Sequence, residues 1–152
     1  MWPHILATFV FVMNIDRRRL AGGLLLAAVL APAAAPAHAA RRVPVQNITN
    51  AMPPGMKGQT LERIEALIIA AASSIGWTFR RPGLGPGLLE VTYRRKAHVA
   101  VADITFDRDN WAITYKSSEG LNAEGGLIHP TYNDWIRKLE RTINARLGAV
   151  PS

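Results

Sequence analysis

The sequence has no cysteine in its 152 residues. This absence excludes disulfide bonds, thiol catalysis and cysteine-bound zinc, and it also excludes membrane attachment through a lipidated cysteine. Acidic residues are scarce as well: 11 Asp and Glu stand against 18 Lys and Arg, which gives a net charge of +7. A basic balance bears on solubility and on association with anionic material, and it says nothing of the fold.

A long unbroken apolar run is also missing. The main apolar stretch, residues 20–37, is rich in Gly and Ala and is interrupted by two prolines. It is therefore too short and too broken for a permanent membrane span, which needs about 20 residues. Three arginines at 17–19 precede it, and it runs into the small-x-small sequence Ala37-His38-Ala39, the pattern of an export signal. We predict a signal peptide over residues 1–39, cleaved near Ala39–Ala40.

The mature protein is then expected to be periplasmic or secreted. Residues 1–12 precede a more ordinary start at Met13, and we interpret them as a mis-assigned start. The arginine triplet also fits a twin-arginine signal loosely; we favour general secretion and leave the other route open. Residues 40–152 carry 15 Lys and Arg against 10 Asp and Glu, a net charge of +5. Anionic lipid, polysaccharide or an acidic protein fits this charge better as a partner than nucleic acid does.

Residues 40–58 contain three prolines, two glycines and no periodic apolar face, so we predict a flexible leader there. A single domain should follow over residues 59–148, with a short tail at 149–152. Its first element is an amphipathic helix that begins after Thr60, because apolar residues recur from Leu61 at intervals of three and four. Thr60 is placed to cap this helix and Gly76 to end it.

Four extended stretches come next, at 77–81, 88–95, 97–106 and 110–117. The polar segments between the last three are short enough for hairpin turns, which predicts an antiparallel meander. The stretch 97–106 is apolar on both faces, so we expect it to be a central strand with a bulge near Asp103.

A second helix is predicted from Pro130, which suits the first helical position. Its apolar residues share one face, and Gly148 and Pro151 end it. The expected fold is α+β: a four-stranded, mainly antiparallel sheet covered on one face by two helices, in the order α-β-β-β-β-α.

The start of the second predicted helix contains several residue types that are common in binding sites. Tyr132 and Trp135 lie on the apolar stripe and are expected in the core, whereas His129 lies near the cap position. Asn133 and Asp134 should lie on the exposed side of the first turn. This structural interpretation is favoured, and a small polar pocket of His129, Asn133 and the loop 116–122 is the alternative.

Two chemical interpretations of the same region are weaker. Ser117 or Ser118 with His129 and Asp134 has the residue types of a hydrolytic triad, but triads are recognised by geometry, and the Gly-x-Ser-x-Gly elbow is missing. The mature chain has only two histidines, His98 and His129, on different elements. We therefore predict no catalytic set, metal site or cofactor.

Basic residues cluster where hairpins end, at Arg80 and Arg81 and again at Arg94, Arg95 and Lys96. Charges at such positions commonly protect strand edges from pairing with other chains. The alternative is an anion-binding patch formed by Arg94, Arg95 and Lys96.

The chain resembles a family of small exported bacterial proteins, many of them lipoproteins, over most of residues 60–147. The resemblance rests on the following residues: Trp77, the stretch 98–107, Ile113, Tyr115, Ser118, Ile128, His129, Tyr132, Asn133, Trp135, Ile136, Leu139 and Ile143. It implies a shared small α+β fold, and it implies that Ser118, His129, Tyr132 and Asn133 form one structural or binding unit. It implies no particular activity. The chain departs from the lipoproteins by lacking the lipidated cysteine.

Three functional hypotheses follow. The leading one is a non-catalytic exported domain that binds an envelope component or a protein partner, through the residues around Ser118, His129 and Asn133 or through the Arg94–Lys96 tip. The second is a small hydrolase that uses His129 with Ser117 or Ser118. The third is a structural module that dimerises through a sheet edge.

Overall fold

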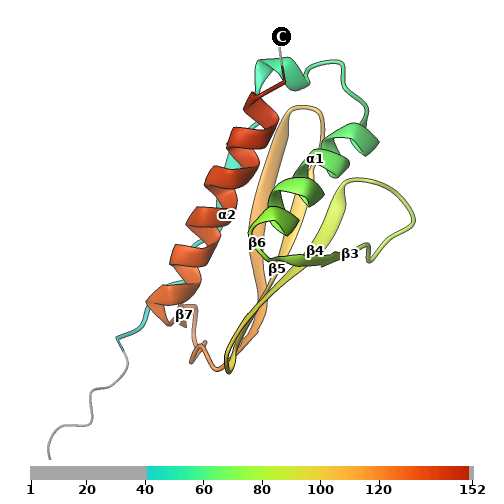
Figure 1. Cartoon of the computed structure of the whole chain (residues 1–152). Coiled ribbons are helices and arrows are strands. Elements are labelled where there is room, and N and C mark those ends of the chain that lie inside the picture. The colour runs from blue at the N-terminus through green and yellow to red at the C-terminus, as the bar shows by residue number, and fades with distance from the viewer. Residues whose placement is uncertain (1–40, 151–152) are drawn as a thin grey trace, which may run out of the picture. The chain divides into compact units, whose positions relative to one another are not determined.

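The computed structural model describes residues 41–150 (Figure 1). The predicted signal peptide, its cleavage site and the start codon lie outside the described residues. The elements, in chain order, are β1 (Val43–Pro44), β2 (Ile48–Ala51), the 3-10 helix η1 (Pro54–Met56), α1 (Leu61–Ser74), β3 (Thr78–Arg80), β4 (Leu88–Arg95), β5 (His98–Phe106), β6 (Asn110–Glu119), β7 (Leu127–Ile128) and α2 (Pro130–Gly148).

The main sheet has five antiparallel strands in the order β2-β6-β5-β4-β3, and β1 pairs with β7 in a separate two-stranded sheet. The predicted α+β class, the antiparallel meander from β4 to β6 and the central position of β5 are confirmed. The bulge lies between Val101 and Ala102. The extra residue is Lys116 of β6 and not Asp103 of β5, because Val101 and Ala102 pair with Ser117 and Tyr115.

The predicted strand number of four was wrong, because the fifth strand comes from the expected leader. Ile48 of β2 pairs with Ile113 of β6 and is buried. Residues 43–56 therefore contribute β1, β2 and η1 to the fold and are not a leader outside it. The sequence of β2, Ile-Thr-Asn-Ala, shows no apolar alternation, because the polar residue Asn50 shares a face with Ile48.

Both helices begin as the sequence predicts. The Thr60 hydroxyl oxygen accepts a hydrogen bond from the backbone N–H of Arg63, which caps α1. Gly76 follows the end of α1 with φ +88, a conformation that glycine adopts without strain. Pro130 occupies the first turn of α2, where its missing N–H breaks no bond.

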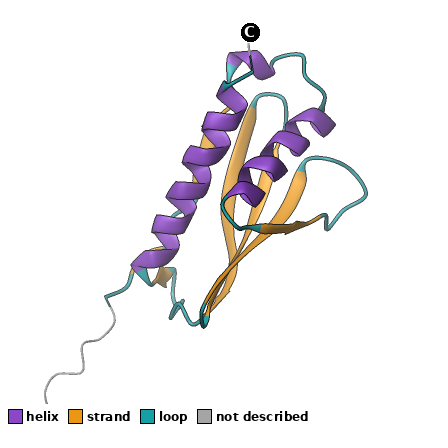
Figure 2. Ribbon diagram, viewed as in Figure 1, coloured by secondary structure: helices purple, strands orange, loops and turns teal. Residues whose placement is uncertain are grey.

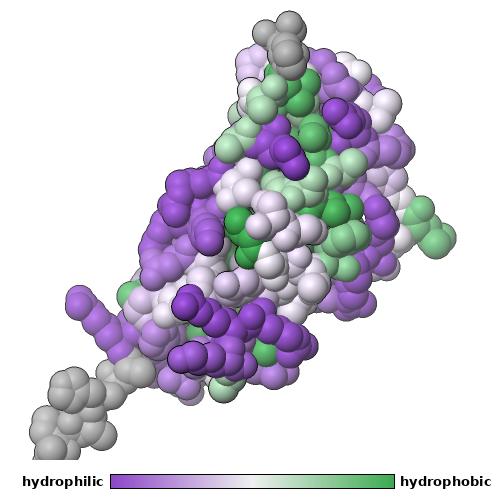
Figure 3. Space-filling model, viewed as in Figure 1, coloured by the Kyte–Doolittle hydropathy of each residue, from purple (hydrophilic) through white to green (hydrophobic). Residues whose placement is uncertain are grey.

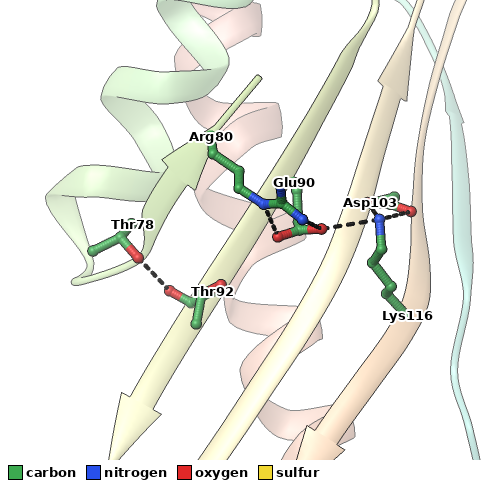
Figure 4. Close-up of polar contacts among 6 residues, drawn as sticks. All are labelled: Thr78, Arg80, Glu90, Thr92, Asp103 and Lys116. Atoms are coloured by element: carbon green, nitrogen blue, oxygen red, sulfur yellow. Dashed lines mark hydrogen bonds and ion pairs between the residues drawn. The ribbon is translucent and has the colours of Figure 1, made fainter. Parts of the chain in front are cut away.

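The helices pack on one face of the sheet (Figures 1 and 2). The core between them and the sheet contains the largest fully buried side chains: Trp111, Tyr132, Met56, Ile64, Ile68, Leu89, Ile104, Ile113, Leu121, Ile128, Ile136 and Leu139. Tyr132 and Trp135 are both buried, as expected. The opposite face of the sheet carries the ion pairs drawn in Figure 4.

Candidate functional site

Several elements end at the same end of the sheet. The β4–β5 hairpin turns there, and Val99 after the turn pairs with Glu119 at the end of β6. The chain then runs into β7, which pairs with β1 and leads directly into α2. The rings of His98 in β5 and His129 before α2 stack with centroids 6.5 Å apart. Figure 1 shows this end at the bottom of the view, with the start of α2.

The hairpin tip carries the basic residues that the sequence singled out. Arg95 pairs with His98, so the turn itself consists of Lys96 and Ala97. Arg94, Arg95 and Lys96 are exposed, and within residues 41–150 no carboxylate forms an ion pair with any of them. Figure 3 shows hydrophilic residues gathered at this end of the molecule. We call Arg94, Arg95 and Lys96 the tip cations.

The other two hairpin arginines do not join the tip cations. Arg80 lies in β3 opposite Glu90, near the start of β4, and forms a bidentate ion pair with its carboxylate. Arg81 forms an ion pair with the buried carboxylate of Glu65 in α1. Their charges are thus neutralised by the fold, whereas those of the tip cations are not.

Asn133 was expected on the exposed side of α2, and this prediction was wrong. Its side chain accepts a hydrogen bond from the backbone N–H of Gln46 (3.1 Å) and donates one to the backbone C=O of Pro44 (2.9 Å). Asn133 is 8% exposed because the segment around β1 covers the first turn of the helix. Asp134, its neighbour, is exposed as predicted and pairs with Arg137.

His129 has the capping role that the structural interpretation assigned to it. Its ring nitrogen Nδ1 accepts a hydrogen bond from the backbone N–H of Thr131 (3.3 Å) at the start of α2. Ser118 instead shares a hydrogen bond of 3.1 Å with the Tyr115 hydroxyl. Among the residues that the structure describes, no hydrogen bond joins Ser117 or Ser118 to His129, so the hydrolytic arrangement receives no support from this geometry.

Tyr132 lies beside the Ser118–Tyr115 pair. Its ring packs edge-to-face on that of Tyr115, with centroids 5.3 Å apart. The Tyr132 hydroxyl is buried and has no hydrogen-bond partner among the described residues, and burial raises the pKa of this hydroxyl. Of the predicted unit, Ser118 and Tyr132 are thus linked through Tyr115, whereas His129 and Asn133 make separate structural contacts.

A hollow of 430 Å³ lies next to this cluster and was missed by sequence reasoning. It is lined by Val45, Asn47, Tyr115, Ala123, Glu124, Gly125, Gly126 and Leu127. The Asn47 side-chain oxygen accepts a hydrogen bond from the backbone N–H of Tyr115 (2.8 Å), immediately before β2 begins to pair with the edge of β6. The sequence carried no signal for the hollow, because one wall comes from the segment that was expected to be a leader.

A charge network on the helix-free face was also missed (Figure 4). The Glu90 carboxylate receives the Arg80 guanidinium and, at 2.9 Å, the Lys116 ammonium, which also lies 3.1 Å from Asp103. These hydrogen bonds, the one from Arg80 first, lower the pKa of Glu90 to about 2. The four charges cancel, so the network holds strands together and offers no net charge to a ligand.

Neither metal binding nor membrane crossing finds support in the described part of the chain. Residues 41–150 contain no group of three or more His, Asp or Glu side chains placed to hold a metal ion. No helix among them is long and apolar enough to cross a membrane.

No protein-family model matches this chain, and none of the curated proteins matches it in sequence. The resemblance to exported bacterial proteins therefore stays a prediction.

Proposed function

We propose that this protein is a non-catalytic exported domain that binds an anionic component of the cell envelope through the tip cations. One observation carries the proposal: three successive exposed cations occupy the end of β4 and the turn that follows it, and none forms an ion pair with a carboxylate of residues 41–150. A group of unpaired cations attracts anionic partners and increases the rate of their association. The other predicted surface is a weaker candidate, because His129 and Asn133 are engaged in helix capping and chain anchoring.

The backbone of Lys96 adds support. Its φ of 55 lies in the left-handed region, which costs a non-glycine residue about 1–2 kcal/mol. Glycine is the residue that such a turn favours. A lysine at this position is therefore unfavourable for the fold, which is consistent with selection for its charge.

The test is co-sedimentation with isolated cell envelopes. We compare the exported protein with the variant Arg94→Gln/Arg95→Gln/Lys96→Gln and with the control Arg108→Gln/Lys138→Gln/Arg141→Gln. The control removes three other exposed cations that form no ion pair within residues 41–150. Both variants lose the same charge. We expect the tip variant to lose binding and the control to retain most of it. Equal binding of both variants contradicts the proposal, and a thermal melt of each variant verifies that it is folded.

A further inference from the structure

The tip cations are joined by a second pair of cations at the same end of the molecule. Arg41 and Arg42 immediately precede β1, which pairs with β7 beside the start of α2. The Arg42 guanidinium binds Glu124 at 2.6 Å, in the loop that follows β6, and Arg41 is exposed. We call Arg41, Arg42 and the tip cations together the basic end. Among residues 41–150, the carboxylates of Glu119, Glu124 and Asp134 also lie on the elements that meet at this end, and Glu124 and Asp134 are paired with Arg42 and Arg137.

The basic end projects cations from separate chain segments and does not gather them around a concavity. The tip cations lie at the end of β4 and in the two-residue turn after it, and none of them lines the neighbouring 430 Å³ hollow. Arg41 reaches the same end from a different element. Such an arrangement fits a surface with many anions side by side better than a single small ligand, because each cation can meet its own phosphate.

The basic end lies close in the sequence to the apolar stretch at residues 20–37. Only residues 38–40 separate that stretch, residues 20–37, from Arg41. An export signal that is anchored through this stretch therefore leads in the sequence almost directly into Arg41 of the basic end.

From these observations we infer that the basic end docks on an anionic phospholipid bilayer, with the tip cations and Arg41 against the lipid phosphates. The inference rests on the proposed function and names the envelope component. Each Lys or Arg near an anionic membrane surface strengthens binding roughly fivefold, so removal of three tip cations should weaken binding about 100-fold. Binding of this kind falls as salt is added, because counterions screen the surface potential.

The experiment measures pelleting of the exported protein, recovered from the extracytoplasmic fraction, with two kinds of vesicle. One is phosphatidylcholine alone and the other an equimolar mixture of phosphatidylcholine and phosphatidylglycerol. We expect binding to the mixed vesicles only. The tip variant should bind about 100-fold more weakly, Arg41→Gln/Arg42→Gln should be intermediate, and the Arg108/Lys138/Arg141 control should bind nearly as well as the natural protein.

Two outcomes overturn the inference: no binding to the mixed vesicles, or equal weakening in the tip and control variants. Delipidated envelope separates this failure from failure of the proposed function. Tip-dependent binding to the delipidated material, without vesicle binding, rejects the bilayer and retains an anionic envelope polymer as the partner. Loss of both rejects the bilayer and the proposed function together.

Discussion

Tyr132 and Asn133 are adjacent in the sequence and both are buried, but their polar groups have different surroundings. Both polar ends of the Asn133 amide are hydrogen-bonded to the backbone near β1, at separations of 87 and 89 residues. The Tyr132 hydroxyl has no partner among the described residues. A buried polar group without a partner loses its hydration and gains no bond in return, so it destabilises the folded state.

We therefore expect Tyr132→Phe to leave the free energy of unfolding unchanged or to raise it by about 1 kcal/mol, because the ring stays and the unpaired hydroxyl is removed. Tyr115→Phe is the matched control. It removes the hydrogen bond to Ser118 and should lower the free energy of unfolding by about 1 kcal/mol. Urea denaturation measures both. A clear loss of stability in Tyr132→Phe would show that the hydroxyl has a partner, such as a buried water or a ligand.

Among the elements, the hairpin tip depends on a glycine from a neighbouring segment. Gly120 follows β6 with φ +69, and a Cβ atom there would lie 2.6 Å from the backbone oxygen of Ala97 and 2.9 Å from Nδ1 of His98. Only glycine allows the chain after β6 to approach the β4–β5 turn this closely. The position of the tip cations is thus set by contacts between elements as well as by the turn itself.

Gly120→Ala should lower the free energy of unfolding by at least about 2 kcal/mol, because left-handed strain is added to a backbone clash. Gly125→Ala is the control, since its φ of +57 carries similar strain but no atom beyond its own chain neighbours lies within 4 Å of the added Cβ. That variant should lose only about 1 kcal/mol. Chemical denaturation compares the two. Equal losses would mean that the turn moves freely away from Gly120.

At the scale of the whole molecule, the charges divide between neutralised and free groups. Arg80, Glu90, Asp103 and Lys116 come from four successive strands and neutralise one another across the helix-free face. The tip cations remain without such partners within residues 41–150. The fold therefore separates a neutral network, which joins the strands, from a basic end, to which we assign binding.

The network predicts a pH dependence of stability. Folding lowers the pKa of Glu90 from 4.5 to about 2, so its carboxylate stabilises the fold fully above pH 4.5, and this contribution is lost as the pH falls from 4.5 to about 2. Glu90→Gln should be less stable at neutral pH and should lose less stability over that interval. Hydrogen bonds from the Asn110 and Asp109 backbone also lower the pKa of Asp107, so some acid sensitivity should remain in the variant.

Thermal unfolding from pH 7 to pH 2 measures this difference. Asp134→Asn is the control, because that carboxylate is largely exposed in its pair with Arg137, and exposed pairs contribute little. Its profile should follow that of the natural protein. If Glu90→Gln does the same, the network does not stabilise the fold as described.

The elements that the sequence determined by itself are those whose signal is local. Thr60 and Gly76 bound α1, Pro130 opens α2, and the strands from β3 to β6 alternate or are apolar throughout, because caps, turns and periodicity act over a few residues. These signals were sufficient for the α+β class, for the antiparallel meander and for an exposed basic tip.

The remaining features depend on contacts between segments that are distant in the sequence. Residues 43–51 were expected to be a leader but form β1 and β2, and Asn133 is buried beneath this segment. Arg81 pairs with Glu65, whereas the tip cations have no ion-pair partner within residues 41–150. Each of these outcomes depends on a partner far away in the chain. Such partners meet only where burial of the core brings distant segments together, and local propensity does not specify which segments meet.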